Sequence, residues 1–172
     1  MSDLRSAAVP ALSSEDHVRG PAEGMLLIAY ADLECAYCAA LHVQLEEMRA
    51  KTPLRVAYRH FPVRSSHPRA WAAACATEAA GLQGRFWEMH DAILTDQAHI
   101  EDPHLWKLAE ALDLDLDDFE SDRRSEAIAE RVRRDFTGGV RAGVVTTPTV
   151  FRDGQAFSGA GLRSTLAGLL PI

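Results

Sequence analysis

The sequence predicts an α/β protein in which two separate stretches of chain build one central mixed sheet. A continuous apolar run at 25–30 is followed by a helical pattern and then by an alternating run at 54–61, which together form a β-α-β unit. Near the C-terminus, runs at 147–151 and 156–158 flank an Asp-Gly pair, a strong signal for a β-hairpin. The helical pattern between these stretches predicts a helical insertion between the two halves of the sheet.

The helix after the first strand is expected to start near Cys35 and to end at about Ala50, before Pro53. Its apolar positions recur at spacings of three and four, the period of one helix face. These positions are Cys38, Leu41, Leu45 and Met48.

Helical patterns then continue from about 68 to 136, with an Ala-rich stretch at 71–80 and another segment at 86–94. Asp102 and Pro103 are expected as the N-cap and first residue of the next helix. A further helix carries Ile128, Val132 and Phe136 and precedes a change of pattern after Gly138 and Gly139, and 162–170 closes the chain as a short helix.

We therefore expect an N-terminal extension at 1–22 and one domain at 23–172, with the insertion at about 64–141. The 172 residues suit a single domain, and 47% apolar and 25% charged residues are ordinary for a globular protein. The net charge of −7 argues against a nucleic-acid partner. Neither a secretory h-region at 1–20 nor an apolar run of membrane-spanning length is present, so we expect a cytoplasmic protein without a membrane partner.

Cys35 and Cys38 form a Cys-x-x-Cys motif at the predicted start of a helix. Unpaired backbone N–H groups and the helix dipole favour negative charge there, and therefore favour the thiolate. Only the thiolate attacks a disulfide sulfur, and the spacing lets the second sulfur resolve the mixed disulfide. Because Cys38 is in register with the apolar face, we expect it to face the core and Cys35 to be the exposed nucleophile.

Two motifs and the helical block between them resemble the DsbA-like branch of the thioredoxin superfamily. The first is ADLECAYC at 31–38, and the second is TTPTVF at 146–151 with the Asp153-Gly154 pair that follows it. The resemblance covers about residues 23–170. It implies a thioredoxin fold with a helical insertion over the active site, and protein-disulfide oxidoreductase activity.

The same resemblance implies the residues that meet the substrate. Pro148 matches the family's cis-proline beside the cysteines, although taken alone Thr147-Pro148 would be an ordinary strand entry. Thr147 matches the residue whose backbone binds the polypeptide, and Ala36 and Tyr37 between the cysteines complete the expected substrate-binding set. The cycle needs no cofactor or metal, because the electrons reside in the sulfurs.

Two positions depart from the family's pattern. Ala36 stands where relatives usually have proline, and Ala29 stands where many have a carboxylate six residues before the first cysteine. The first change leaves the direction of electron flow open, because the dipeptide between the cysteines tunes the reduction potential in this superfamily. The second weakens the case for assisted proton transfer to or from Cys38.

The predicted function is thiol–disulfide exchange with a polypeptide or low-molecular-weight thiol or disulfide, together with a reductant or oxidant that recycles the pair. One alternative is a redox-responsive binding module that does not turn over. A less favoured alternative is a structural zinc domain using Cys35, Cys38 and His42, although no second Cys-x-x-Cys supplies the usual ligand set. Cys75 lies in an apolar helix context and is expected to be a small buried hydrophobe, with a third redox thiol as the alternative.

Overall fold

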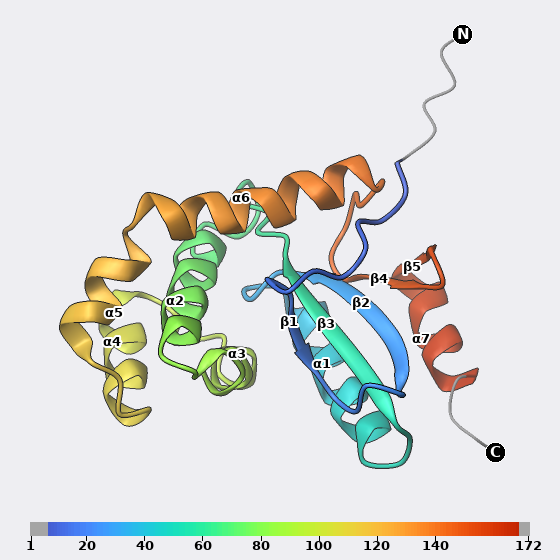
Figure 1. Ribbon diagram of the computed structural model, residues 1–172, viewed down its shortest axis with the longest axis horizontal. Helices are drawn as coiled ribbons and strands as arrows, with labels where there is room; N and C mark the ends of the chain where they lie inside the picture. The colour runs from blue at the N-terminus through green and yellow to red at the C-terminus, as the bar shows by residue number, and fades with distance from the viewer. Residues whose placement is uncertain (1–6, 169–172) are drawn as a thin grey trace, which may run out of the picture.

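A computed structural model describes residues 7–168 and shows a five-stranded sheet with helices on both faces (Figure 1). The strands are β1 (His17–Arg19), β2 (Met25–Ala31), β3 (Leu54–His60), β4 (Thr149–Arg152) and β5 (Gln155–Ser158). The helices are α1 (Ala36–Arg49), α2 (Ala70–Leu82), α3 (Phe86–Thr95), α4 (Asp102–Ala111), α5 (Leu116–Arg123), α6 (Glu126–Arg141) and α7 (Gly159–Gly168).

The sheet is mixed and joins the two halves of the chain. Its strand order is β1-β3-β2-β4-β5, with β2 and β3 parallel and every other pair antiparallel. The central strand β2 receives β4 from the other side of the insertion, and Ala29 pairs with Val150. The predicted α/β class and thioredoxin-like arrangement are therefore confirmed.

The two faces of β2 explain why its sequence is apolar without interruption. Leu27 and Ala29 join the core beneath α1 and α7. Ile28 and Tyr30 join a second core on the opposite face, which also contains Phe61 and Ala142. A strand covered on both faces has no polar side to alternate with.

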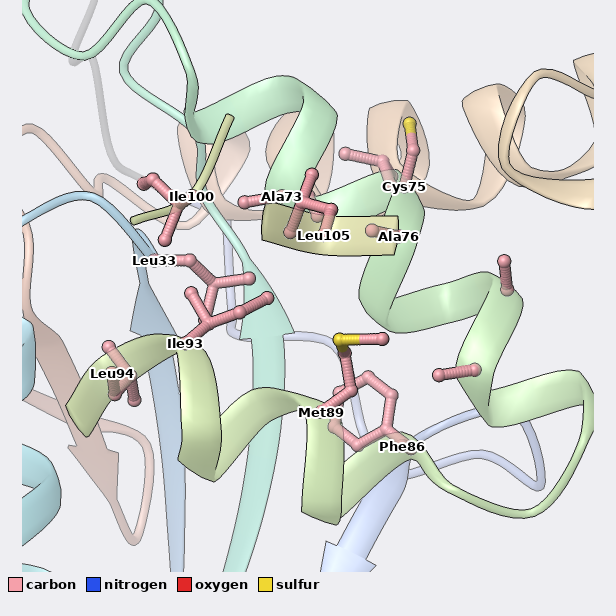
Figure 2. Close-up of a cluster of buried hydrophobic side chains, with 14 of the residues drawn as sticks. Leu33, Ala73, Cys75, Ala76, Phe86, Met89, Ile93, Leu94, Ile100 and Leu105 are labelled. Atoms are coloured by element: carbon pink, nitrogen blue, oxygen red, sulfur yellow. The ribbon is translucent and has the colours of Figure 1, made fainter. Parts of the chain in front are cut away.

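The helical insertion α2 to α6 has a core of its own that reaches the start of α1. Figure 2 shows Leu33 beside Ile93 and Ile100, with Met89 and Phe86 further along α3. Both cysteines of the motif belong to the same cluster of buried residues. The insertion therefore packs directly against the segment that carries the thiols.

The edge strand β1 was not predicted and lies within the segment assigned to the N-terminal extension. Three half-buried residues are too few for a visible alternation. Its neighbourhood is fixed by Arg59, which is 4% exposed and donates to the carboxylate of Asp16 at 2.7 and 3.0 Å and to the carbonyl of Pro10 at 2.8 Å. This buried ion pair ties the chain before β1 to β3.

Several predicted boundaries were wrong by a few residues. The N-cap of α4 is Glu101, one residue before the predicted Asp102, and α7 begins at Gly159 while the end of its predicted range at 169–170 lies outside the described residues. A separate helix, α5, begins after Asp115, whose side chain accepts from the amide of Asp118.

Among residues 7–168, no helix has both the length and the apolarity that a membrane crossing requires.

The glycine pair at the end of the insertion does not end α6, which continues to Arg141. The pair instead allows close contact where α6 passes over the sheet. A Cβ atom on Gly139 would lie 2.8 Å from the ring of Phe61 and 2.9 Å from that of Tyr30, whereas one on Gly138 would lie 3.6 Å from its nearest neighbours. Gly139 is therefore required by packing.

We expect Gly139→Ala to lower the free energy of unfolding by about 1–3 kcal/mol, because the added methyl group overpacks the contact with the two rings. Gly138→Ala is the matched control in the same helix, and should be neutral or stabilising by up to about 1 kcal/mol because alanine favours the helix. Urea denaturation measures both. Equal losses in the two variants would contradict the packing argument.

Candidate active site

The chain turns sharply between the end of β2 and the start of α1. The carbonyl of Asp32 accepts from the amide of Cys35 at 3.1 Å, and one carboxylate oxygen of Asp32 accepts from the amide of Glu34 at 2.8 Å. Cys35 is then the N-cap of α1, with an extended backbone, and no side chain caps this end. The first amides of the helix are thus left to interact with the cysteine sulfur.

Cys35 is buried, with 4% of its surface exposed, so the expectation of an exposed nucleophile was wrong. Its sulfur lies 3.6 Å from the carbonyl oxygen of Thr147 in the loop before β4. The sequence could not show this contact, because Thr147 is more than a hundred residues away in the chain. The pairing of β2 with β4, in which Tyr30 lies opposite Thr149, brings the two segments together.

The surroundings of Cys35 favour its thiolate. A hydrogen bond from the Cys38 thiol, acting against the effect of burial, lowers the pKa of Cys35 to about 5. The backbone amides of Tyr37 and Cys38 also lower the pKa of Cys35. At neutral pH Cys35 is therefore ionised and nucleophilic.

Cys38 is held in the opposite state. It is 2% exposed and lies on the buried face of α1 with Leu41, Leu45 and Met48, as the spacing predicted. Burial, reinforced by the negative charge of Cys35, raises the pKa of Cys38 well above its ordinary value. The amide of Asp32 lies 3.4 Å from its sulfur. One thiol is thus ionised and the other protonated, as attack followed by resolution requires.

Of the predicted substrate-binding residues, two are buried beside the thiols and two lie at the surface. The Thr147-Pro148 peptide bond is cis, and both residues are buried. The hydroxyl of Thr149 donates to the carbonyl of Thr146 at 2.7 Å and fixes the loop before β4. Ala36 and Tyr37 lie at the surface, Tyr37 with 78% of its area exposed.

Comparison with protein families decides the classification. The model of the DSBA-like thioredoxin domain matches residues 26–170, which covers β2 to α7 and both motifs. The chain belongs to this family.

Solved structures share the fold of this DSBA-like domain at low sequence identity. The thiol-disulfide exchange protein alpha-DsbA2 from Wolbachia pipientis aligns with a TM-score of 0.77 at 18% identity, covering 91% of this chain and 88% of that one. A thioredoxin-like oxidoreductase from Silicibacter pomeroyi DSS-3 gives 0.77 at 19% identity, covering 91% and 92%. BdbD from Bacillus subtilis gives 0.75 at 14% identity, covering 95% and 97%.

Curated relatives with closer sequences are much longer proteins. A protein named Na(+)/H(+) antiporter NhaA 1 from Salinispora arenicola (strain CNS-205) is 40% identical over 154 residues, which is 88% of this chain and 24% of that protein. One named Na(+)/H(+) antiporter NhaA from Herminiimonas arsenicoxydans is 39% identical over 172 residues, 98% of this chain and 27% of that protein. The DSBA-like domain therefore spans about a quarter of the length of these relatives.

Asp32 organises the active-site turn of the DSBA-like domain, a role that the sequence analysis missed. Its carboxylate is fully buried, and its second oxygen accepts from the amide of Val63 at 2.7 Å and pairs with Nδ1 of His67 at 2.9 Å. Burial opposes the protonation of His67, but the hydrogen bond and charge of Asp32 raise the pKa of His67 above its ordinary value. An acidic residue directly after a buried strand was the available signal.

Gln97 holds the same turn from the insertion. Its side-chain amide donates to the carbonyls of both Leu33 and Cys35, each at 2.9 Å. Nearby, Arg69 donates to both oxygens of Glu34 through its amide and its guanidinium, at 2.7 and 2.8 Å. The insertion therefore contributes hydrogen bonds to the active site as well as apolar cover.

The two remaining candidate residues, His42 and Cys75, make other contacts. His42 faces Arg19, whose guanidinium lies 3.4 Å from Nδ1 of its ring. Among the described residues, the grouping that brings three possible metal-ligand atoms within 4.8 Å is His42, His90 and Asp91, which contains neither cysteine. Arg19 donates to both oxygens of Asp91, so the group is an ion-pair cluster with a cation of its own. Cys75 is buried as predicted, and burial raises its pKa to about 11.

We expect alkylation of Cys35 by iodoacetamide to rise with pH around a midpoint near 5, because a depressed pKa keeps the thiolate present above that pH. Cys38→Ala should move the midpoint upward by about one to two pH units, since it removes a hydrogen bond to a charged group worth about 1.5–3 kcal/mol. Cys38→Ser keeps a donor and should shift it less. Mass spectrometry separates the modification of Cys35 from that of Cys75, and an unchanged midpoint in Cys38→Ala would contradict the assignment.

We expect Gln97→Ala to speed hydrogen–deuterium exchange in the first turn of α1 and to cost about 1–3 kcal/mol of unfolding free energy, because two buried carbonyls lose a partner. Gln83→Ala is the matched control. Gln83 also makes two hydrogen bonds to backbone, both to Asp115 and both away from the thiols. If exchange at 36–39 speeds equally in both variants, Gln97 has no specific part in holding this turn.

Proposed function

We propose that this DSBA-like domain is a thiol–disulfide oxidoreductase in which Cys35 exchanges disulfides with a polypeptide or small-molecule substrate and Cys38 resolves the intermediate. The observation that carries the proposal is the opposite ionisation of two adjacent thiols, with the pKa of Cys35 lowered to about 5 and that of Cys38 raised. A structural cysteine pair has no need of this difference.

The steps follow from that asymmetry. In the reducing direction, the Cys35 thiolate attacks a substrate disulfide, forms a mixed disulfide and releases one substrate sulfur as a thiolate. Cys38 then loses its proton and attacks Cys35, which releases the second substrate sulfur with its electron pair. The oxidising direction is the reverse, and a separate reductant or oxidant resets the pair.

The surface around the thiols suits a polypeptide. Tyr37 and Val145 are large apolar residues with 78% and 90% of their areas exposed, one between the cysteines and one two residues before Thr147. An extended peptide beside the loop before β4 would meet both the Thr147 backbone and these side chains. These apolar side chains would add buried area to a peptide bound there.

We also propose, as a second candidate, a redox-responsive module of a larger protein that exchanges once and does not turn over. It is favoured by the match to about a quarter of the length of proteins named as antiporters. For either function we propose a cytoplasmic setting, which the presence of three cysteines without a disulfide framework supports.

Turnover distinguishes the two functions. With a disulfide-bonded polypeptide and excess dithiothreitol, the oxidoreductase should reduce many substrate molecules per protein molecule, and Cys35→Ser should abolish the acceleration. When dithiothreitol is left out, Cys38→Ser should accumulate a mixed disulfide with the substrate, visible by mass spectrometry. A single stoichiometric exchange would favour the module, and failure of the two cysteines to form a reversible disulfide would overturn both.

A further inference from the structure

A small cavity lies beneath α1, directly beside Cys38. Its volume is about 20 Å³, enough for one water molecule. Much of its wall is apolar and includes Ala29, Leu41 and Leu45, and Ala29 contributes only a methyl group. The polar residues on the wall are Cys38, Arg19, His42, Tyr58 and His90.

His90 lines this cavity and has an unused ring nitrogen. The residue is 3% exposed, and its Nε2 is buried without a hydrogen-bond partner among the described residues, as is Nε of Arg19. By contrast, the hydroxyl of Tyr58 donates to the carbonyl of Ala31 at 3.2 Å. Buried polar groups are normally satisfied, so an orphan acceptor on the wall of a water-sized cavity calls for an explanation.

The protonation of His90 can be assigned from its neighbour. Its Nδ1 lies 2.8 Å from a carboxylate oxygen of Asp91, which can only accept when ionised, so Nδ1 carries the hydrogen and Nε2 has the free lone pair. Burial lowers the pKa of His90 to about 4, which keeps the ring neutral at physiological pH. Nε2 therefore has a free lone pair but is only a weak base.

We infer that His90 accepts the proton of Cys38 through one water molecule in the cavity that both side chains line. The inference rests on the proposed exchange reaction and assigns a residue to its second step. Cys38 must ionise to attack, and Asp32 is not free to take the proton because its two oxygens already accept from the amides of Glu34 and Val63 and pair with His67.

The Cys38 sulfur forms a bond to the Cys35 sulfur, and the bond between Cys35 and the substrate sulfur breaks, with its electron pair leaving on the substrate as a thiolate. The Cys38 proton passes to the water, which passes one of its own to Nε2 of His90. In the oxidising direction the same path returns a proton to Cys38 when substrate attack on Cys35 displaces it.

The charges that face His90 set the pH range of this step. Asp91 stabilises the imidazolium, while Arg19 from β1 and His42 from α1 oppose it. Tyr58 on β3 is neutral, because burial raises its pKa well above the ordinary value. Once Cys35 is bonded to substrate its negative charge is lost, and that charge is one of the causes that hold the Cys38 proton in place. Proton transfer is therefore easiest in the intermediate that needs it.

The test separates the two steps with a symmetrical aromatic disulfide whose released thiolates absorb visible light. Release of the first thiolate reports attack by Cys35, and release of the second reports resolution by Cys38. In His90→Phe we expect the second release to slow by about tenfold near pH 7, less than for a base whose pKa matches the pH, because the pKa of His90 is only about 4. It should then rise about tenfold per pH unit as Cys38 ionises unaided, while the first release changes less than about twofold.

His42→Gln is the control, because it alters the same cavity and leaves Nε2 of His90 in place. We expect its second release to be no slower than that of the unaltered protein, because the substitution removes one of the charges that oppose protonation of His90. Near-UV circular dichroism checks folding, and if His90→Phe does not fold, His90→Gln should show the same added pH dependence because an amide cannot hold the proton.

Equal second-release rates in a folded His90 variant and the unaltered protein between about pH 5 and 9 would overturn the inference. So would an equal slowing in His42→Gln, which would make the effect one of cavity packing. If the unaltered protein releases no thiolate at all, the proposed function fails instead, so the two failures are distinguishable.

Discussion

The mutual influence of the two thiols is the interaction on which the chemistry of this domain depends. It stabilises charge on Cys35 and withholds it from Cys38, so one sulfur is prepared for attack and the other for a later step. The two thiols influence each other because α1 begins where β2 ends, which puts one cysteine at the helix tip and the other a turn below it, inside the core. Asp32, Gln97 and the loop before β4 maintain that arrangement from three directions.

The helical insertion is part of this arrangement. Leu33 and both cysteines share a hydrophobic cluster with α2 and α3, and Gln97 reaches the carbonyl of Cys35. A redox pair on the bare sheet would have one wall. Here the insertion supplies a second wall, and His90 of α3 lines the cavity beside Cys38. The inserted segment therefore contributes to the surroundings of both thiols.

Much of the fold could be predicted because its signals are local. The apolar run of β2, the period of α1 and the Asp-Gly turn each occupy a short window, and the position of Cys38 on the buried face followed from spacing alone. The burial of Cys35 could not be predicted in this way, since Thr147 covers it from the other end of the chain. The hydrogen bonds of Gln97 to backbone carbonyls and the close packing at Gly139 could not be predicted either, because both depend on distances between elements that no sequence period encodes.

The pairing of β2 with β4 also has a consequence for the order in which the molecule is made. The nucleophile, its helix and the whole insertion precede β4 in the chain, and long-range pairing of this kind is a slow event in folding. A nascent chain therefore carries Cys35 before the Thr147 carbonyl can cover it. During that interval the thiol lacks the cover of Thr147, so the finished site arises only when the last strands join the sheet.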